Sequence, residues 1–260
     1  MKLHRPKPYL RTPPGIMLVL ALFQEHRLPY ILFKCDHIFA GQNKNLDILL
    51  ETKEEYQQAA RLLEQRGFIL RFSEKFERYK MMYCGFVKDT AGQGTFHSIH
   101  LHREIAWHGM IALDKKEVFR RKRRLAPGII VPSLEDSIVI QAGHVLFENG
   151  IVREREQAYF TRFNESGIDQ QYIQQQLTRN HWNYGFHQVL AKKKEKPSLT
   201  IPELFLTWSG KLVREPTTAW YVLRKSLRKL LRPLNPRSTG CCLALLGVNG
   251  SGKTTLAKKT

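Results

Sequence analysis

The chain has 260 residues, of which 42% are hydrophobic and 25% are charged. These values are typical of a globular protein with one or two domains, and they exclude a largely disordered chain. The net charge of +19 and a pI near 10.0 are unusual and indicate an anionic partner, such as nucleic acid, an anionic membrane surface or a phosphorylated substrate.

The first elements in chain order predict the start of a sheet. The apolar run GIMLVLALF at 15–23 is far shorter than the roughly 20 residues that a membrane-spanning helix needs, so we expect no transmembrane segment. YILFKC (30–35) and NLDILLE (45–51) are typical of two strands that flank a turn at Gly41.

A helix and three more strands are expected next. Thr52 and Glu55 form a capping-box pattern that opens a helix, and Gly67 is a stop signal. Strand patterns then recur over 68–73, 76–87 and 95–101. This order predicts a mixed sheet with a helix packed on it, which is an α+β fold.

From residue 114 the pattern becomes helical. DKKEVFRRKRRL (114–125) reads as a helix, and its stretch 115–124 holds seven bases and one acid, or +6. Ser133 and Asp136 cap the next helix. Two more helices are expected near 151–164 and 169–195.

Residues 196–240 read as a basic connector. When the residues from 191 onward are included, the stretch 191–240 holds twelve basic and three acidic residues, a net charge of +9. TAWYVLRKSLRKLLRP (218–233) places leucines on one helical face and bases on the other, which predicts a basic amphipathic helix. This helix either packs on the protein as a linker or lies against a membrane or nucleic acid; a solvated face is the alternative for both basic stretches.

The sharpest motif is GVNGSGKT at 247–254, which matches G-x-x-x-x-G-K-[ST] after an apolar strand, CCLALL, and before a helical start. Backbone N–H groups of such a loop bind the phosphates of ATP, Lys253 contributes the catalytic charge at the β and γ phosphates, and Thr254 is a ligand of Mg²⁺. The predicted nucleotide-binding residues are Gly247, Val248, Asn249, Gly250, Ser251, Gly252, Lys253, Thr254 and Thr255.

Little sequence follows this motif. A P-loop fold needs further parallel strands and an acid on a second strand to hold Mg²⁺, and only 257–260 follow GVNGSGKTTL. We therefore expect the chain to end inside its P-loop domain, and we do not expect these 260 residues alone to transfer a phosphoryl group.

Four longer segments resemble a known arrangement. YILFKCDHIFAGQNKNLDILLE, SIHLHREIAWHG and IIVPSLEDSIVIQAGHVLFENG resemble the nucleotidyltransferase-like domains that precede thymidylate-kinase-like P-loop domains, and ALLGVNGSGKTTLAKK resembles the start of such a kinase domain. The resemblance implies a nucleotidyltransferase-like α/β domain, a helical subdomain, a basic linker and the start of a P-loop kinase domain, at 1–113, 114–195, 196–240 and 241–260.

The sequence departs from that family at its acids. The resemblance places Asp47 at the second metal-binding acid, but Asn45 and His100 stand where the first and third acids are expected. Asn has no negative charge for Mg²⁺, and His is a poor Mg²⁺ ligand. We therefore predict an inactive transferase site in which Asp47 is the remaining metal ligand. Asp36 precedes the turn and is not included.

Three histidines, His97, His100 and His102, lie along or directly after one predicted strand. Alternation along a strand separates His97 from His100 and His102, which share a face. A zinc site built from these two, with His108, is a minor alternative. His144 lies on an apolar helical stripe and reads as a core residue. The aromatic residues of NHWNYGF (180–186) also read as core, with base stacking as the alternative.

These observations favour an ATP-binding, kinase-like protein that, as a full-length enzyme, transfers a phosphoryl group to a nucleoside monophosphate or another phosphorylated small-molecule acceptor. Its cofactors are ATP and Mg²⁺. An ATP-binding-cassette or DNA-maintenance ATPase and a non-enzymatic basic nucleic-acid-binding module remain alternatives.

The four cysteines show no metal-ligand spacing, which indicates reduced thiols in a cytoplasmic protein.

Overall fold

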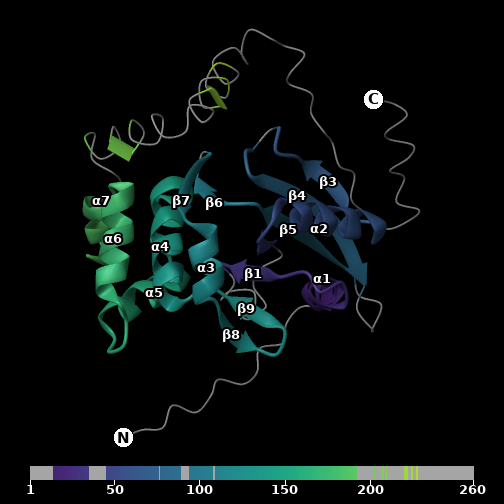
Figure 1. Ribbon diagram of the computed structural model, residues 1–260, viewed down its shortest axis with the longest axis horizontal. Coiled ribbons are helices and arrows are strands. Elements are labelled where there is room, and N and C mark those ends of the chain that lie inside the picture. Colours follow the sequence, from purple (N-terminus) through teal and green to yellow (C-terminus); the bar gives the residue numbers. More distant parts are fainter. Residues whose placement is uncertain are drawn as a thin grey trace, which may run out of the picture. The chain divides into compact units, whose positions relative to one another are not determined.

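The computed structural model describes residues 14–34, 45–75, 77–88, 94–107 and 109–191, together with single positions between 202 and 227 (Figure 1). The chain divides into two compact units, Met1–Tyr221 and Val222–Thr260, and almost all described residues belong to the first. The predicted P-loop at 247–255 lies outside the described residues.

The first unit contains a five-stranded mixed sheet with the strand order β1-β2-β5-β4-β3. β2 and β5 are parallel, and the other neighbouring strands are antiparallel. The five strands are β1 (Tyr30–Phe33), β2 (Asn45–Leu50), β3 (Ile69–Phe72), β4 (Lys80–Lys88) and β5 (Gly94–His102). Each overlaps a predicted strand, so the α+β class and the mixed sheet are confirmed.

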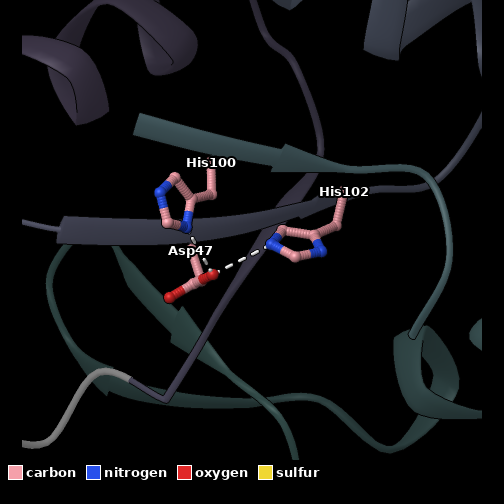
Figure 2. A group of neighbouring side chains, drawn as sticks. All are labelled: Asp47, His100 and His102. Carbon is pink, nitrogen blue, oxygen red and sulfur yellow. Dashed lines mark hydrogen bonds and ion pairs between the residues drawn. The ribbon is translucent and has the colours of Figure 1, made fainter. Parts of the chain in front are cut away.

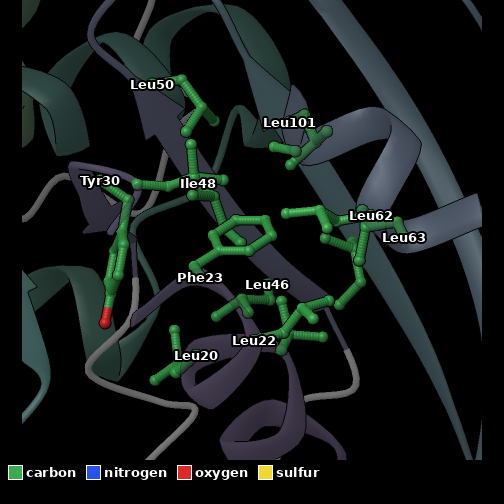
Figure 3. Packing of buried hydrophobic residues seen from close by; sticks show 14 of the residues in the cluster. Leu20, Leu22, Phe23, Tyr30, Leu46, Ile48, Leu50, Leu62, Leu63 and Leu101 are labelled. Atoms are coloured by element: carbon green, nitrogen blue, oxygen red, sulfur yellow. The ribbon is translucent and has the colours of Figure 1, made fainter. Parts of the chain in front are cut away.

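Two helices, α1 (Pro14–Glu25) and α2 (Lys53–Gln65), supply the helical side of the first hydrophobic cluster (Figure 3). The predicted capping box of α2 is present: the Glu55 N–H donates to Thr52 Oγ1 at 3.1 Å, and the Thr52 N–H donates to Glu55 Oε2 at 2.8 Å. The labelled members in Figure 3 are Leu20, Leu22, Phe23, Tyr30, Leu46, Ile48, Leu50, Leu62, Leu63 and Leu101.

The other side chains of the sheet join a second hydrophobic cluster. Ile31, Phe33 and Leu49 contribute to it from β1 and β2, and the segments after the sheet supply the rest. Those segments are β6 (Ile105–Trp107), β7 (Met110–Leu113), α3 (Lys115–Arg121), β8 (Arg123–Ala126), β9 (Ile129–Val131), α4 (Leu134–His144) with a π-type turn (Val145–Asn149), α5 (Glu154–Phe160) with a 3₁₀ turn (Thr161–Asn164), α6 (Gln170–Asn180) and α7 (Asn183–Leu190).

Part of this region differs from the sequence-based expectation. The helix predicted over 114–125 ends at Arg121, because the next residues form the β8–β9 hairpin, with Gly128 at φ 72° in its turn. The helix predicted over 169–195 is divided in two at His181, which adopts a left-handed backbone conformation with φ 59°. The α1 helix and the β6–β7 hairpin were not expected from the sequence.

None of the helices in the described part of the chain combines the length and the apolar character that crossing a bilayer requires.

Candidate functional site

Three polar side chains meet on the sheet face that contributes to the second cluster: Asp47 of β2, and His100 and His102 of β5 (Figure 2). The parallel register of β2 and β5 pairs Asp47 with His100. Because side chains alternate along a strand, Ile99 and Leu101 enter the first cluster while His100 and His102 point to the opposite face. The sheet therefore brings together residues that lie more than fifty positions apart in sequence.

One carboxylate oxygen joins the three side chains. Asp47 Oδ1 lies 3.1 Å from His100 Nδ1 and 2.9 Å from His102 Nε2. An ionised carboxylate only accepts hydrogen bonds, so both ring nitrogens donate to it. The Nε2 atom of His100 lies 3.1 Å from Ser98 Oγ, and the His102 ring contacts Phe33 edge to face with centroids 4.7 Å apart. These contacts fix the orientation of both imidazoles.

A lysine and a second carboxylate extend the site. Lys34, which directly follows β1, places Nζ 3.7 Å from Asp47 Oδ1 and 3.5 Å from Glu148 Oε2. Glu148 also pairs with His144, four residues earlier on the same helical segment. Phe33, Lys34, His102 and Glu148 line one pocket, so this group of charges borders a concave surface.

Burial and charge act in opposite directions on Asp47 and Lys34. Burial alone would raise the pKa of Asp47, but Lys34 and the hydrogen bonds from His100 and His102 hold it well below the usual value. Burial alone would lower the pKa of Lys34, but Asp47 and Glu148 raise it. At neutral pH the two groups therefore form a buried ion pair.

The same environment sets the charge of two neighbouring groups. Burial lowers the pKa of His102 to about 4, although Asp47 opposes this change, so the His102 imidazole is neutral at pH 7. Burial would raise the pKa of Glu148, but the hydrogen bond with His144 and the charge of Lys34 lower it to about 2. Glu148 is therefore ionised over the physiological range.

The donor set differs from that of a two-metal nucleotidyltransferase. Such a site uses several carboxylates to hold two Mg²⁺ ions. Here Asp47 is the only acid on β2 and β5, Asn45 is exposed at the start of β2, and two imidazoles occupy the neighbouring positions. The arrangement suits a nitrogen-preferring cation better than Mg²⁺.

The structure brings together some predicted site residues and adds others. Asp47 and His100 share one site, as the resemblance implies, and His102 lies on the same face while His97 does not. His144, expected as a core residue, pairs with Glu148. The predicted Lys253, Thr254 and the rest of the loop, together with Asp36 and His108, lie outside the described residues.

Lys34 and Glu148 were missed from the sequence. A weak signal existed for each: Lys34 is a charged residue at the end of a fully apolar strand, and Glu148 stands at helical i,i+4 spacing from His144. Neither signal shows that Lys34 and Glu148 contact each other.

No protein-family model and no curated protein match the chain. One similar solved structure is that of an antigenic nucleotidyltransferase-like protein from Paracoccidioides brasiliensis, with 8% sequence identity and a TM-score of 0.37 over 80% of this chain and 90% of that one. Function is therefore inferred from the residues of this chain.

Proposed function

We propose that this protein binds ATP–Mg²⁺ through the loop at 247–254 and belongs to a P-loop phosphotransferase that acts on a nucleoside monophosphate or a related phosphorylated acceptor. The single observation that carries the proposal is the complete GVNGSGKT motif between a strand pattern and a helix pattern. Lys253 would bind the β and γ phosphates, and Thr254 would bind Mg²⁺. The cysteine pattern supports a cytoplasmic location.

In this proposal the sheet domain does not perform two-metal nucleotidyl transfer. Asp47 already interacts with one ammonium and two imidazoles, and its two strands carry no second acid. A triphosphate held by two Mg²⁺ ions needs more negative charge than this set supplies. The sheet domain therefore accompanies the nucleotide-binding loop in the same chain and does not catalyse a transfer reaction of its own.

The nucleic-acid alternative receives less support from the basic stretch 115–124. Three of its bases form ion pairs: Lys115 with Glu104 at 3.4 Å, Arg120 with Glu117 at 2.6 Å, and Arg121 with Glu135 at 3.1 Å. Glu117 is already counted in the net +6 of this stretch, but Glu104 and Glu135 lie outside it, so the charge open to a phosphate backbone is smaller than +6. Steep salt dependence of nucleic-acid binding that survives Lys253→Ala would favour this alternative.

Nucleotide binding is tested by measuring the affinity for ATP–Mg²⁺ of the parent, Lys253→Ala and Lys258→Ala. The last variant removes the same charge five residues further along and serves as the matched control. Loss of a hydrogen-bonded charge at the phosphates should weaken binding on the order of tenfold or more in Lys253→Ala, and Lys258→Ala should bind like the parent. Equal binding by Lys253→Ala and the parent would refute the assignment.

A further inference from the structure

We propose that Asp47, His100 and His102 bind a divalent transition-metal ion of the zinc type, separate from the Mg²⁺ of the nucleotide loop. The three ligand atoms come from two neighbouring parallel strands and lie within 4.8 Å of one another. They are the only group of at least three such ligands that the described residues bring together.

The distances fit a small ion. Zinc lies about 2.0–2.2 Å from imidazole nitrogen and carboxylate oxygen, so two ligands at a tetrahedral angle are roughly 3.3 Å apart. Asp47 Oδ1 is 3.1 Å from His100 Nδ1 and 2.9 Å from His102 Nε2. Both distances are within a few tenths of an ångström of this spacing, and the two imidazole nitrogens lie within 4.8 Å of each other. An ion can therefore take the place of the two hydrogen-bond protons when each neutral imidazole carries its proton on its other nitrogen.

The donor types select the metal. Imidazole is a favoured ligand of zinc, copper, nickel and iron, whereas Mg²⁺ and Ca²⁺ prefer sets made of oxygen. Two histidines and one carboxylate supply three ligands, which leaves a fourth tetrahedral position for water or for an oxygen of a bound ligand.

Neighbouring residues already orient the ligands. Ser98 Oγ lies 3.1 Å from the far nitrogen of His100, and Phe33 packs against the His102 ring. Contacts of this kind hold an imidazole so that one nitrogen faces the metal. His102 also lines the pocket beside Lys34 and Glu148.

Lys34 is the competitor for this position. Its ammonium group lies 3.7 Å from Asp47 Oδ1, and it has a second carboxylate partner, Glu148, at 3.5 Å. When an ion binds Asp47, Lys34 can keep Glu148 as its partner. Repulsion between the ammonium and the ion nevertheless weakens metal binding, so Lys34→Met should raise the metal affinity by about tenfold.

The direct test is zinc binding by chelator-treated protein, measured as bound metal per chain and as affinity. The parent should bind about one ion that a large excess of Mg²⁺ does not displace. His100→Gln and His102→Gln should each lower the affinity at least about tenfold, while His26→Gln, at an exposed position, should match the parent. Circular dichroism of the metal-free variants shows whether they fold.

Two further measurements do not depend on the histidine variants. Co²⁺ bound to the parent should give the visible absorption of a tetrahedral or five-coordinate ion, and Lys34→Met should bind zinc more tightly than the parent. Zinc binding that is the same in the parent, His100→Gln and His102→Gln would overturn the proposal. So would a parent that binds no zinc, or an unchanged or weaker affinity in Lys34→Met.

Discussion

Asp47 and Lys34 should be energetically coupled, and a double-mutant cycle measures this directly. Their charged atoms are 3.7 Å apart, and their side chains are 11% and 9% exposed. At that distance the attraction is about 4 kcal/mol for an effective dielectric constant of about 20, before the cost of removing both groups from water. That cost cancels much of the attraction, so we expect a coupling free energy of about 1–2 kcal/mol.

Asp47→Asn keeps the shape of the side chain but removes its charge. Among the described residues, Lys34 then keeps its ion pair with Glu148, so this variant should lose about 3 kcal/mol of unfolding free energy, the lower end of the range for a broken buried pair. Lys34→Met leaves Asp47 with His100 and His102 and should cost less. The double variant should lose less unfolding free energy than the two single variants lose when their losses are added.

The assay is urea unfolding of the parent, both single variants and the double variant, with a chelator present so that bound metal does not add to stability. Trp107 and Trp182 are buried in the second cluster and report unfolding by fluorescence. Additivity of the two single effects within about 0.5 kcal/mol would refute the buried ion pair.

Three other predictions follow from single contacts. The folded structure lowers the pKa of His102 from 6.5 to about 4, so between these pH values His102 binds a proton more readily in the unfolded chain than in the folded one. The unfolding free energy should therefore fall as the pH drops from 6.5 to about 4. His102→Gln should flatten this pH dependence, and an unchanged slope would contradict the assignment. Ser133→Ala should cost about 1 kcal/mol in urea unfolding, because Ser133 Oγ accepts the Asp136 N–H at 3.1 Å; no loss would show that this cap is not stabilising. Gly143→Ala should lower stability by about 1–3 kcal/mol despite the better helix propensity of alanine, because the new Cβ would lie 2.6 Å from the buried Trp107 ring; a more stable variant would show that the ring moves aside.

Local signals explain which parts of the fold could be predicted. The capping box at Thr52 and Glu55 and the apolar alternation of the strands depend on neighbouring residues, and both appear in the structure as expected. The β8–β9 hairpin was missed because RRKRRL carries strong helix formers, and the pairing of Arg123 with Val131 that overrides them is not local.

The site was predictable only in part for the same reason. Alternation alone places His100 and His102 on one face, and the family resemblance brings Asp47 near them. The approach of Lys34 and Glu148 depends on how the end of β1 meets the helix after α4, and sequence spacing does not encode that contact. The contact between these two charged residues therefore could not be predicted from the sequence.

We propose that the chain binds nucleotide through the loop at 247–254 and not through the Asp47 site. The most direct measurement compares ATP–Mg²⁺ affinity in the parent, Lys253→Ala and His100→Gln. We expect Lys253→Ala to weaken binding on the order of tenfold or more and His100→Gln to bind like the parent. Binding that is lost in His100→Gln and kept in Lys253→Ala would contradict it and would move the nucleotide site to the sheet domain.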